Sequence, residues 1–134
     1  MSIRAVADTH ALIWYIYDDP RLSETARSTM EAIELSGNHI AAPSISLVEM
    51  VYLIEKARIP AESLGKTIAL FKRANPFLVE VALDHPIVET MRLVDRQQVP
   101  DMPDRIITAT ALHLGVPVIS RDGKIRLSTV ATIW

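Results

Sequence analysis

Short hydrophobic runs alternate with longer amphipathic stretches along the whole chain. A run such as 5–8 is too short for a helix and carries a charge only at its last position, which is typical of a buried strand. A stretch such as 22–37 has helical spacing, with Ser23 as a candidate N-cap and Gly37 as a candidate end. By these criteria, strands are predicted at 5–8, 39–44, 77–83, 116–120 and 129–134. Helices are predicted at 10–17, 22–37, 46–59, 61–75, 85–96 and 103–115.

Strand and helix patterns follow each other in turn from one end of the chain to the other. This order is typical of a mainly parallel sheet with helices on both faces, because each parallel connection needs a crossover. No internal repeat, low-complexity segment or Pro/Gly/Ser-rich linker interrupts the pattern. The sequence therefore predicts an α/β fold of about five strands in a single domain spanning 1–134.

The composition is that of an ordinary globular protein, and it narrows the chemistry available. Hydrophobic residues make up 49% and charged residues 22% of the 134 positions, so the chain can bury a core without further staples. Cysteine is absent, which excludes disulfides and thiolate metal sites and suits a reducing cytoplasm. No apolar run approaches the ~18 residues of a membrane span, and the charges at Arg4 and Asp8 do not fit a signal peptide. We therefore expect a cytoplasmic protein without membrane contact.

Acidic residues stand where predicted strands end or where the following helices begin. Asp8 ends the first strand, and Glu49 lies in the first turn after the second. Asp101 and Asp104 open the helix in the segment "PDMPDRIITATAL", and Asp122 follows the fourth strand. In open α/β sheets, sites form beyond the carboxyl ends of the strands. These five carboxylates are therefore candidates for one shared site.

Each of these acids also has a purely structural interpretation. Asp8 could cap the following helix, and Ser46 with Glu49 fits the capping box S-x-x-E. Asp104 would complement a helix dipole, and Asp122 precedes a glycine in a typical turn sequence. For any one of them alone, the structural interpretation is the stronger one.

Convergence of the acids would change this balance. Two carboxylates ~4 Å apart repel by roughly 4 kcal/mol at an effective dielectric of about 20, whereas one helix cap contributes only ~1 kcal/mol. Either the acids remain apart, or a divalent cation holds them together. Oxygen ligands without cysteine favour Mg²⁺ or Mn²⁺ over Zn²⁺. Such an ion activates water and binds phosphate oxygens, which is the chemistry of phosphodiester hydrolysis.

Several segments resemble one family, and they occur in that family's order. They are "ADTHALIW" (7–14), S-x-x-E (46–49), "DMPDRIITATAL" (101–112), "VISRDGKI" (118–125) and the closing "VATIW" (130–134). Together they resemble the PIN domain, and more closely the VapC-type toxins of bacterial and archaeal toxin–antitoxin pairs. The resemblance spans nearly the whole chain.

The resemblance implies a metal-dependent endoribonuclease that hydrolyses RNA with Mg²⁺ or Mn²⁺. It carries the catalytic and metal-binding roles over to Asp8, Glu49, Asp104 and Asp122. Asp101 is the alternative third ligand, and we expect it to cap the helix while Asp104 points into the site. The resemblance also implies a five-stranded parallel sheet, a homodimer, and a toxin–antitoxin hetero-oligomer with a VapB-type antitoxin.

Residues next to these acids are candidates for supporting roles. The hydroxyls of Thr9 and Ser120 could hold a ligand or a water molecule, although both are also ordinary turn residues. The net charge of −2 argues against a broad basic surface for nucleic acid, but not against a local basic rim. Candidates for a rim that contacts RNA phosphates are Arg105, Arg121, Lys124 and Arg126. Arg105 could instead pair with Asp101.

Two helices carry aromatic or apolar residues with more than one interpretation. Some of Trp14, Tyr15 and Tyr17 must face the core, so they are not interpreted as a base-stacking platform, and for His10 packing is favoured over catalysis. The apolar helix 46–59 is a dimer contact, an antitoxin contact or a core helix.

Other functions fit the sequence less well. A receiver domain would need paired acids after the first strand and a lysine after the fifth, whereas one acid follows the first strand and Trp134 ends the last. A nucleotide- or flavin-binding domain would need a glycine-rich first loop, and "ADTHA" contains no glycine. Within the same family, a PIN nuclease for RNA maturation is the alternative to a toxin.

Overall fold

The computed structural model describes residues 2–126, 128 and 130–134. Its strands are β1 (Ile3–Ala7), β2 (His39–Pro43), β3 (Leu78–Val81), β4 (Val118–Ile119) and β5 (Thr132–Ile133). Its α-helices are α1 (Thr9–Ile16), α2 (Glu24–Leu35), α3 (Ser44–Glu55), α4 (Ser63–Phe71), α5 (His85–Thr90), α6 (Met102–Leu114) and α7 (Gly123–Arg126). A short 3-10 helix, η1 (Met91–Leu93), directly follows α5.

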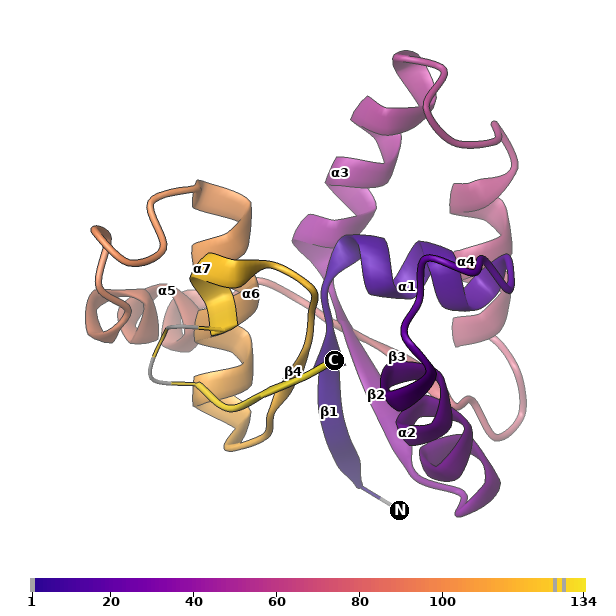
Figure 1. The fold of residues 1–134 in the computed structure, drawn as a ribbon, viewed down its shortest axis with the longest axis horizontal. Coiled ribbons are helices and arrows are strands. Elements are labelled where there is room, and N and C mark those ends of the chain that lie inside the picture. Colours follow the sequence, from indigo (N-terminus) through magenta and orange to yellow (C-terminus); the bar gives the residue numbers. More distant parts are fainter. Residues whose placement is uncertain (1, 127, 129) are drawn as a thin grey trace.

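The strands form one sheet in the order β3-β2-β1-β4-β5, and every neighbouring pair is parallel. β1 therefore lies in the centre of the molecule (Figure 1). The chain first builds one half of the sheet, from β1 through β2 to β3, and then crosses back to add β4 and β5 on the other side. The prediction of an α/β fold with a five-stranded, mainly parallel sheet is confirmed.

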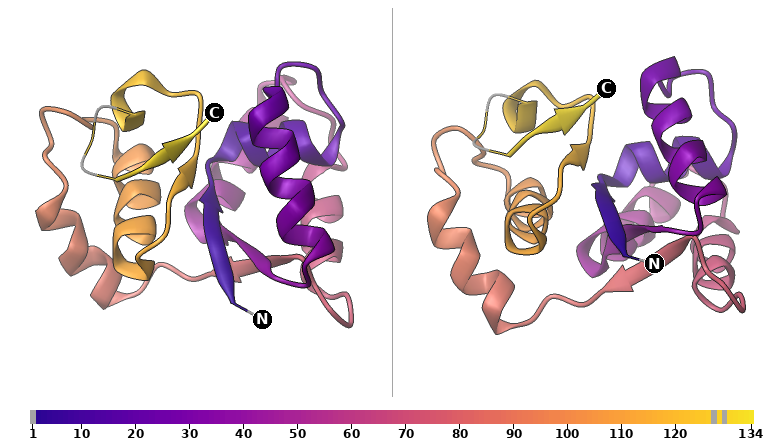
Figure 2. Two further views of the ribbon diagram at one scale, coloured as in Figure 1. Left: turned by 60° about the horizontal axis from the view of Figure 1, so that its bottom comes forward. Right: turned by 90° about the horizontal axis from the view of Figure 1, so that it is seen from below.

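The sheet separates two hydrophobic cores. Along β1, Ala5 and Ala7 face one core and Val6 faces the other, which is the alternation that a strand imposes. Helices α1–α4 cover the first core, and α5–α7 cover the second (Figure 2). All three side chains are fully buried, so β1 forms a continuous apolar run, as central parallel strands do. This double burial fixes the end of β1, and with it Asp8, at the middle of the molecule.

The helix predicted at 85–96 ends early. Helix α5 continues into η1, and Val94 then leaves the helical conformation with φ −93° and ψ 118°. The carbonyls of Met91 and Val94 accept hydrogen bonds from Nη2 of Arg105 in α6, at 2.8 and 3.2 Å. A side chain from a distant helix thus bonds to these carbonyls, a contact that the local sequence pattern does not reveal.

Helix α3 (Ser44–Glu55) begins and ends earlier in the chain than the helix predicted at 46–59. Its N-cap is Pro43, whose side chain makes no capping hydrogen bond, so the predicted capping box of Ser46 and Glu49 is wrong. At the other end, Ala57 adopts a left-handed conformation with φ +55°, which ends the helix before the predicted boundary. Ser46 and Glu49 are therefore free to make contacts outside their own helix.

Further boundaries differ from the prediction, among them those of α4 and β5. Helix α4 is shorter than 61–75, and β5 is shorter than 129–134, of which position 129 lies outside the described residues. Within the described part of the chain, no helix combines the length and the apolarity that a membrane crossing requires.

Candidate active site

The carboxyl ends of β1 and β4 lie side by side at the point where the strand order reverses. The connections that leave these two strands run to opposite sides of the sheet, which leaves a crevice between their ends. The Asp8 N–H donates to the Ile119 carbonyl of β4 at 3.1 Å, and the Ser120 N–H donates to the Ile133 carbonyl of β5 at 3.2 Å. A pocket of about 820 Å³ opens at this edge of the sheet.

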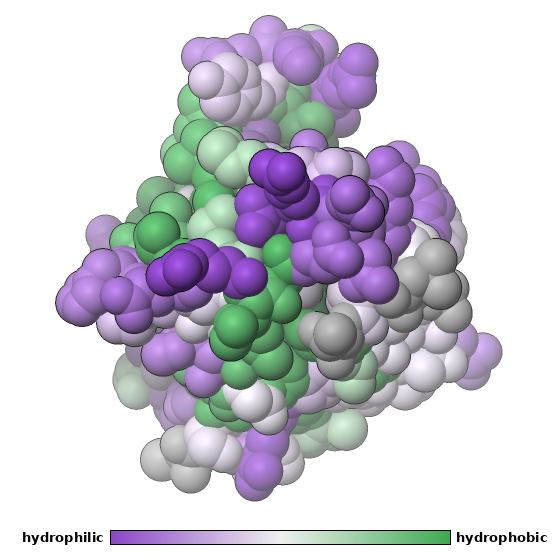
Figure 3. All heavy atoms as spheres, turned by 90° about the vertical axis from the view of Figure 1, so that its left-hand side faces the viewer, coloured by the Kyte–Doolittle hydropathy of each residue, from purple (hydrophilic) through white to green (hydrophobic). Residues whose placement is uncertain are grey.

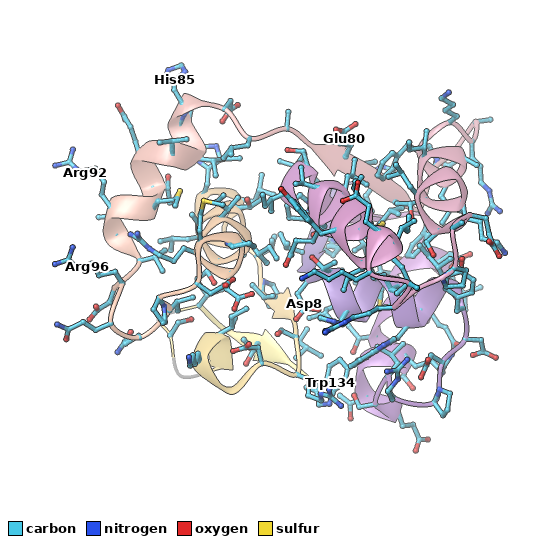
Figure 4. The ribbon with its side chains drawn as sticks, turned by 90° about the horizontal axis from the view of Figure 1, so that it is seen from above. Asp8, Glu80, His85, Arg92, Arg96 and Trp134 are labelled. Carbon is cyan, nitrogen blue, oxygen red and sulfur yellow. The ribbon has the colours of Figure 1, made fainter. Side chains whose placement is uncertain are left out.

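Five acidic side chains line this cavity, which we call the carboxylate pocket. They are Asp8, Glu49, Asp101, Asp104 and Asp122. The cationic side chains in the lining are Arg21, Arg121 and Lys124. All five acids singled out in the sequence are thus brought to one place from four separate segments. Figure 4 shows Asp8 near the middle of the molecule, between the helices that flank the sheet.

Asp8 joins the strand end to the start of α1. Its Oδ1 accepts a hydrogen bond from the Ala11 N–H at 2.8 Å, so the predicted N-cap is confirmed. Its side chain is only 9% exposed. Burial raises the pKa of this carboxyl, while contacts from the Ser120 hydroxyl and the Ala11 amide lower it in part. Asp8 is therefore both a helix cap and a wall of the carboxylate pocket.

Glu49 is oriented by a hydroxyl from the neighbouring helix. The Thr9 Oγ1 lies 2.5 Å from Glu49 Oε1 and 2.9 Å from Ser46 Oγ, which links α1 to α3. Burial raises the pKa of Glu49, the Thr9 hydrogen bond lowers it, and the negative charge of Asp101 raises it further. Thr9 thus supports the site by holding a carboxylate in place.

Asp101 and Asp104 have the different roles that the sequence suggested. Asp101 is the N-cap of α6, and its Oδ2 accepts a hydrogen bond from the Asp104 N–H at 3.1 Å. Asp104 lies in the first turn and lines the carboxylate pocket. Burial, followed by the charges of Asp101 and Asp122, raises the pKa of Asp104 to about 7. Asp104 therefore binds a proton more readily than a surface aspartate would, mainly because it is partly buried and also because other carboxylates lie near it.

Asp122 is held by the short helix α7. Its Oδ1 accepts hydrogen bonds from the N–H groups of Lys124 and Ile125, at 2.8 and 3.1 Å. Its own N–H donates to Ser120 Oγ at 3.0 Å. Ser120 is fully buried at the end of β4, so its hydroxyl supports the turn that carries Asp122.

The donor set of the pocket suits a hard divalent cation. Among the described residues, no three acidic or histidine side chains lie close enough together to enclose a metal ion. Ligation by several of them would therefore require side-chain rotation or bridging water, and Mg²⁺ in particular retains several waters when few carboxylates bind it. Burial is the main cause of the raised pKa of Asp104, and the neighbouring carboxylates raise it further; a bound cation would offset their charge. The residues that could hold it are Asp8, Glu49, Asp104 and Asp122.

The predicted basic rim is only partly present. Arg121 and Lys124 line the carboxylate pocket, as expected. Arg105 does not: its guanidinium bonds to the two backbone carbonyls beside η1, and its Nε is buried without a hydrogen-bond partner. Its assignment to the rim, or to a pair with Asp101, is therefore wrong. The side chain of Arg126 lies outside the part of the chain that the structure describes.

Three aromatic or charged residues of the lining were not predicted as part of the site. Trp14 is 4% exposed and lies in the core, yet its ring also lines the carboxylate pocket together with His10. Arg21 reaches the pocket because the turn after α1 folds back, with the Asp19 N–H donating to the Trp14 carbonyl at 2.8 Å. Asp18, with φ +51°, helps to make that turn. No motif in the sequence marks this return of the chain.

Solved structures with the same fold include three from bacteria. VapBC2 from Rickettsia felis, bound to a DNA fragment from its promoter, matches with a TM-score of 0.71 and 16% identity, over 98% of this chain and 97% of that chain. A toxin–antitoxin complex from Klebsiella pneumoniae matches with a TM-score of 0.63 and 23% identity, over 97% and 96%. FitAcB from Neisseria gonorrhoeae matches with a TM-score of 0.62 and 17% identity, over 96% and 95%.

The sequence itself identifies the family. It matches the PIN domain over residues 5–130, nearly the whole chain. Among curated proteins, no sequence matches it. The chain therefore belongs to the PIN-domain family.

Proposed function

We propose that this protein is a metal-dependent endoribonuclease, and that it is the toxin of a VapBC-type toxin–antitoxin pair. The observation that carries the proposal is the carboxylate pocket: a PIN-domain chain places five acids at the switch point of its sheet. Caps and hydrogen bonds alone do not account for gathering five like charges, because each cap contributes only ~1 kcal/mol. A divalent ion, Mg²⁺ or Mn²⁺, offsets their repulsion.

The residues of the carboxylate pocket have different roles in hydrolysis. When bound, the ion supplies an activated water and a positive charge beside the phosphate oxygens. Asp8, Asp104 and Asp122 bind it. Glu49 has its Oε1 engaged by Thr9, which leaves Oε2 to ligate the ion or to orient the attacking water and accept its proton. Arg121 and Lys124 face the RNA backbone.

Protein partners are the second part of the proposal. Large apolar side chains are exposed on α3, η1 and α6, where Tyr52 is 60%, Leu93 72% and Met102 60% exposed. Figure 3, a view from the side of α5 and α6, shows hydrophobic side chains gathered over the middle of that face. We assign the α3 surface to a homodimer contact.

The antitoxin places a basic side chain against the carboxylate pocket, as charge complementarity favours. Two of the solved structures named above, from Rickettsia felis and Klebsiella pneumoniae, are toxin–antitoxin complexes.

Cleavage of total cellular RNA by the purified, antitoxin-free protein tests the enzyme proposal. Reactions contain Mg²⁺, Mn²⁺ or EDTA, and the test variant is Asp8→Asn, which can keep the cap on the Ala11 N–H while losing the charge. The matched control is Asp84→Asn, because Asp84 is also a helix N-cap but does not line the carboxylate pocket. We expect discrete, metal-dependent products from the wild type and from Asp84→Asn. We expect at least ~100-fold less product from Asp8→Asn.

Equal cleavage by Asp8→Asn and the wild type would contradict the proposal. Cleavage that continues in EDTA would contradict the metal dependence. Circular dichroism verifies that each variant is folded before it is compared.

A further inference from the structure

Trp14 forms a rigid wall of the carboxylate pocket. It lies in α1 and is 4% exposed, so its position is fixed by packing. The His10 ring lies 5.5 Å and the Trp134 ring 5.9 Å from it, measured between centroids. Aromatic pairs at these separations attract each other. The indole therefore offers a fixed surface at the edge of the pocket.

Two guanidinium groups lie against this one indole. The Arg121 guanidinium carbon lies 4.6 Å from the ring centroid, and that of Arg21 lies 5.1 Å from it. The two arginines come from distant segments, after β4 and after α1. The attraction between each guanidinium and the electron-rich face of the ring opposes the repulsion between the two cations. The arrangement gathers positive charge at one point of the pocket.

Only one of these arginines is neutralised. Arg21 pairs with Asp19, with Nη2–Oδ2 at 2.8 Å and Nε–Oδ1 at 3.1 Å. Among the described residues, no carboxylate lies within ion-pair distance of Arg121. Arg121 thus keeps its full charge, and its exposed guanidinium can accept an anion.

The opposite charges of the pocket are kept apart. Among the described residues, no ion pair joins a cation of the carboxylate pocket to one of its five acids. Even Arg121, which directly precedes Asp122 in the chain, lies over Trp14 instead of pairing with it. The pocket therefore offers carboxylates that can hold a cation and the Arg121 guanidinium that can hold an anion, a combination that fits a metal-bound ligand with more than one phosphate.

We propose that Arg121, held over Trp14, binds the RNA backbone phosphate next to the one that is cleaved. This inference rests on the proposed function, in which a metal ion brings the scissile phosphate to the acids. A guanidinium presents a planar fork of donors that matches phosphate oxygens. Because Trp14 is buried and lies beneath the guanidinium groups, it holds the arginines and does not stack on bases.

Binding of a labelled, mixed-sequence single-stranded RNA, measured by fluorescence anisotropy in Mg²⁺ at several salt concentrations, tests the inference. All proteins carry Asp8→Asn, so that the RNA is not cut. The test variant is Arg121→Gln, and the matched control is Arg96→Gln. Figure 4 shows Arg96 pointing outward, far from Asp8.

We expect Arg121→Gln to weaken binding roughly three- to tenfold near physiological salt and to lower the slope of log K against log[salt] by about 0.7, the value for one phosphate contact with a single strand. The loss should be the same for RNAs of different sequence, because phosphate contacts carry no base information. Arg121→Lys should keep the salt slope but not the full affinity, because lysine lacks the planar fork. Arg96→Gln should match the parent protein.

Equal affinity and salt slope for Arg121→Gln and Arg96→Gln would overturn the inference. If the protein with intact acids still cleaves RNA, the proposed function survives that result. If that protein does not cleave RNA but Arg121→Gln weakens binding as expected, Arg121 binds a backbone phosphate, but the catalytic proposal fails and with it the placement of that phosphate beside a cleaved one. A parent protein that binds no RNA overturns both.

Discussion

Asp8, Asp101 and Asp122 each accept a hydrogen bond from a backbone N–H at the start of a helix, and each also lines the carboxylate pocket. A cap holds one carboxylate oxygen in a defined place before any ligand arrives. Three caps of ~1 kcal/mol each also offset part of the repulsion among the acids. The structural and catalytic interpretations of these residues are thus compatible, because the cap is what positions the charge.

Asp104 differs from these three because its side chain caps no helix. Its folded-state pKa of about 7 lies above the ordinary value of 3.8, so between these pH values the folded protein binds more protons than the unfolded chain. Its contribution to stability therefore decreases as the pH rises from about 4 to about 7. Asp104→Asn stays neutral, and we expect it to stabilise the metal-free protein above pH 7 by about 1–2 kcal/mol after solvent screening.

Thermal unfolding of Asp104→Asn and the wild type, without metal and across this pH range, measures the effect. The melting temperatures should converge near pH 4 and separate above pH 7. Asp84→Asn serves as the control and should follow the wild type. Parallel pH profiles for Asp104→Asn and the wild type would show that burial and the neighbouring acids do not raise the pKa of Asp104.

At the scale of elements, the N-terminal turn of α6 sets the position of the third carboxylate. Asp101 caps this turn, Asp104 lies within it, and Arg105 anchors it to the carbonyls beside η1. The sequence indicated Asp101 as the cap, because Pro103 follows it in the first turn, and the family resemblance favoured Asp104 as the ligand. The sequence did not indicate the role of Arg105, since that role depends on where an irregular segment of the chain lies.

Two substitutions at Asp101 separate its capping role from a role in ligation. Asp101→Ala removes the acceptor for the Asp104 N–H, and we expect it to lower the free energy of unfolding by about 1 kcal/mol. Asp101→Asn retains an acceptor and should lower the free energy of unfolding by less than half of this amount. In urea unfolding, Asp101→Ala should therefore have the lower midpoint.

Cleavage assays with the asparagine variants complete this comparison. RNA cleavage should be retained in Asp101→Asn and lost in Asp104→Asn. The reverse result would make Asp101 the ligand and Asp104 the supporting residue.

At the scale of the whole molecule, the order of the strands creates the crevice in which the acids meet. The alternation of strand and helix patterns was sufficient to predict the parallel sheet, and the parallel sheet was sufficient to place the strand-end acids at one edge. The turn that brings Arg21 back over Trp14 depends on tertiary contacts, and so does the approach of Thr9 to Glu49. Neither contact follows from a periodic or local sequence pattern. The sequence therefore could not predict that Arg21 lies over Trp14 or that the Thr9 hydroxyl orients Glu49.

The exposed side chains of α3 lead to a prediction about assembly. Tyr52→Glu places a charge on the proposed dimer contact, and we expect the dimer to become a monomer because the charge would have to be desolvated. Leu35→Glu is the control, since Leu35 is 88% exposed at the end of α2, away from this surface. Size-exclusion chromatography with light scattering measures the masses. A dimer that persists in Tyr52→Glu would rule out α3 as the dimer contact.

The claim that the strand-end acids jointly bind a divalent ion is tested most directly by the anomalous scattering of Mn²⁺ in crystals of the protein. We predict a Mn²⁺ peak inside the carboxylate pocket, with oxygen ligands from Asp8 and Asp104 and water at the remaining positions. A pocket without a peak at saturating Mn²⁺, or a peak bound by other residues, would contradict the account.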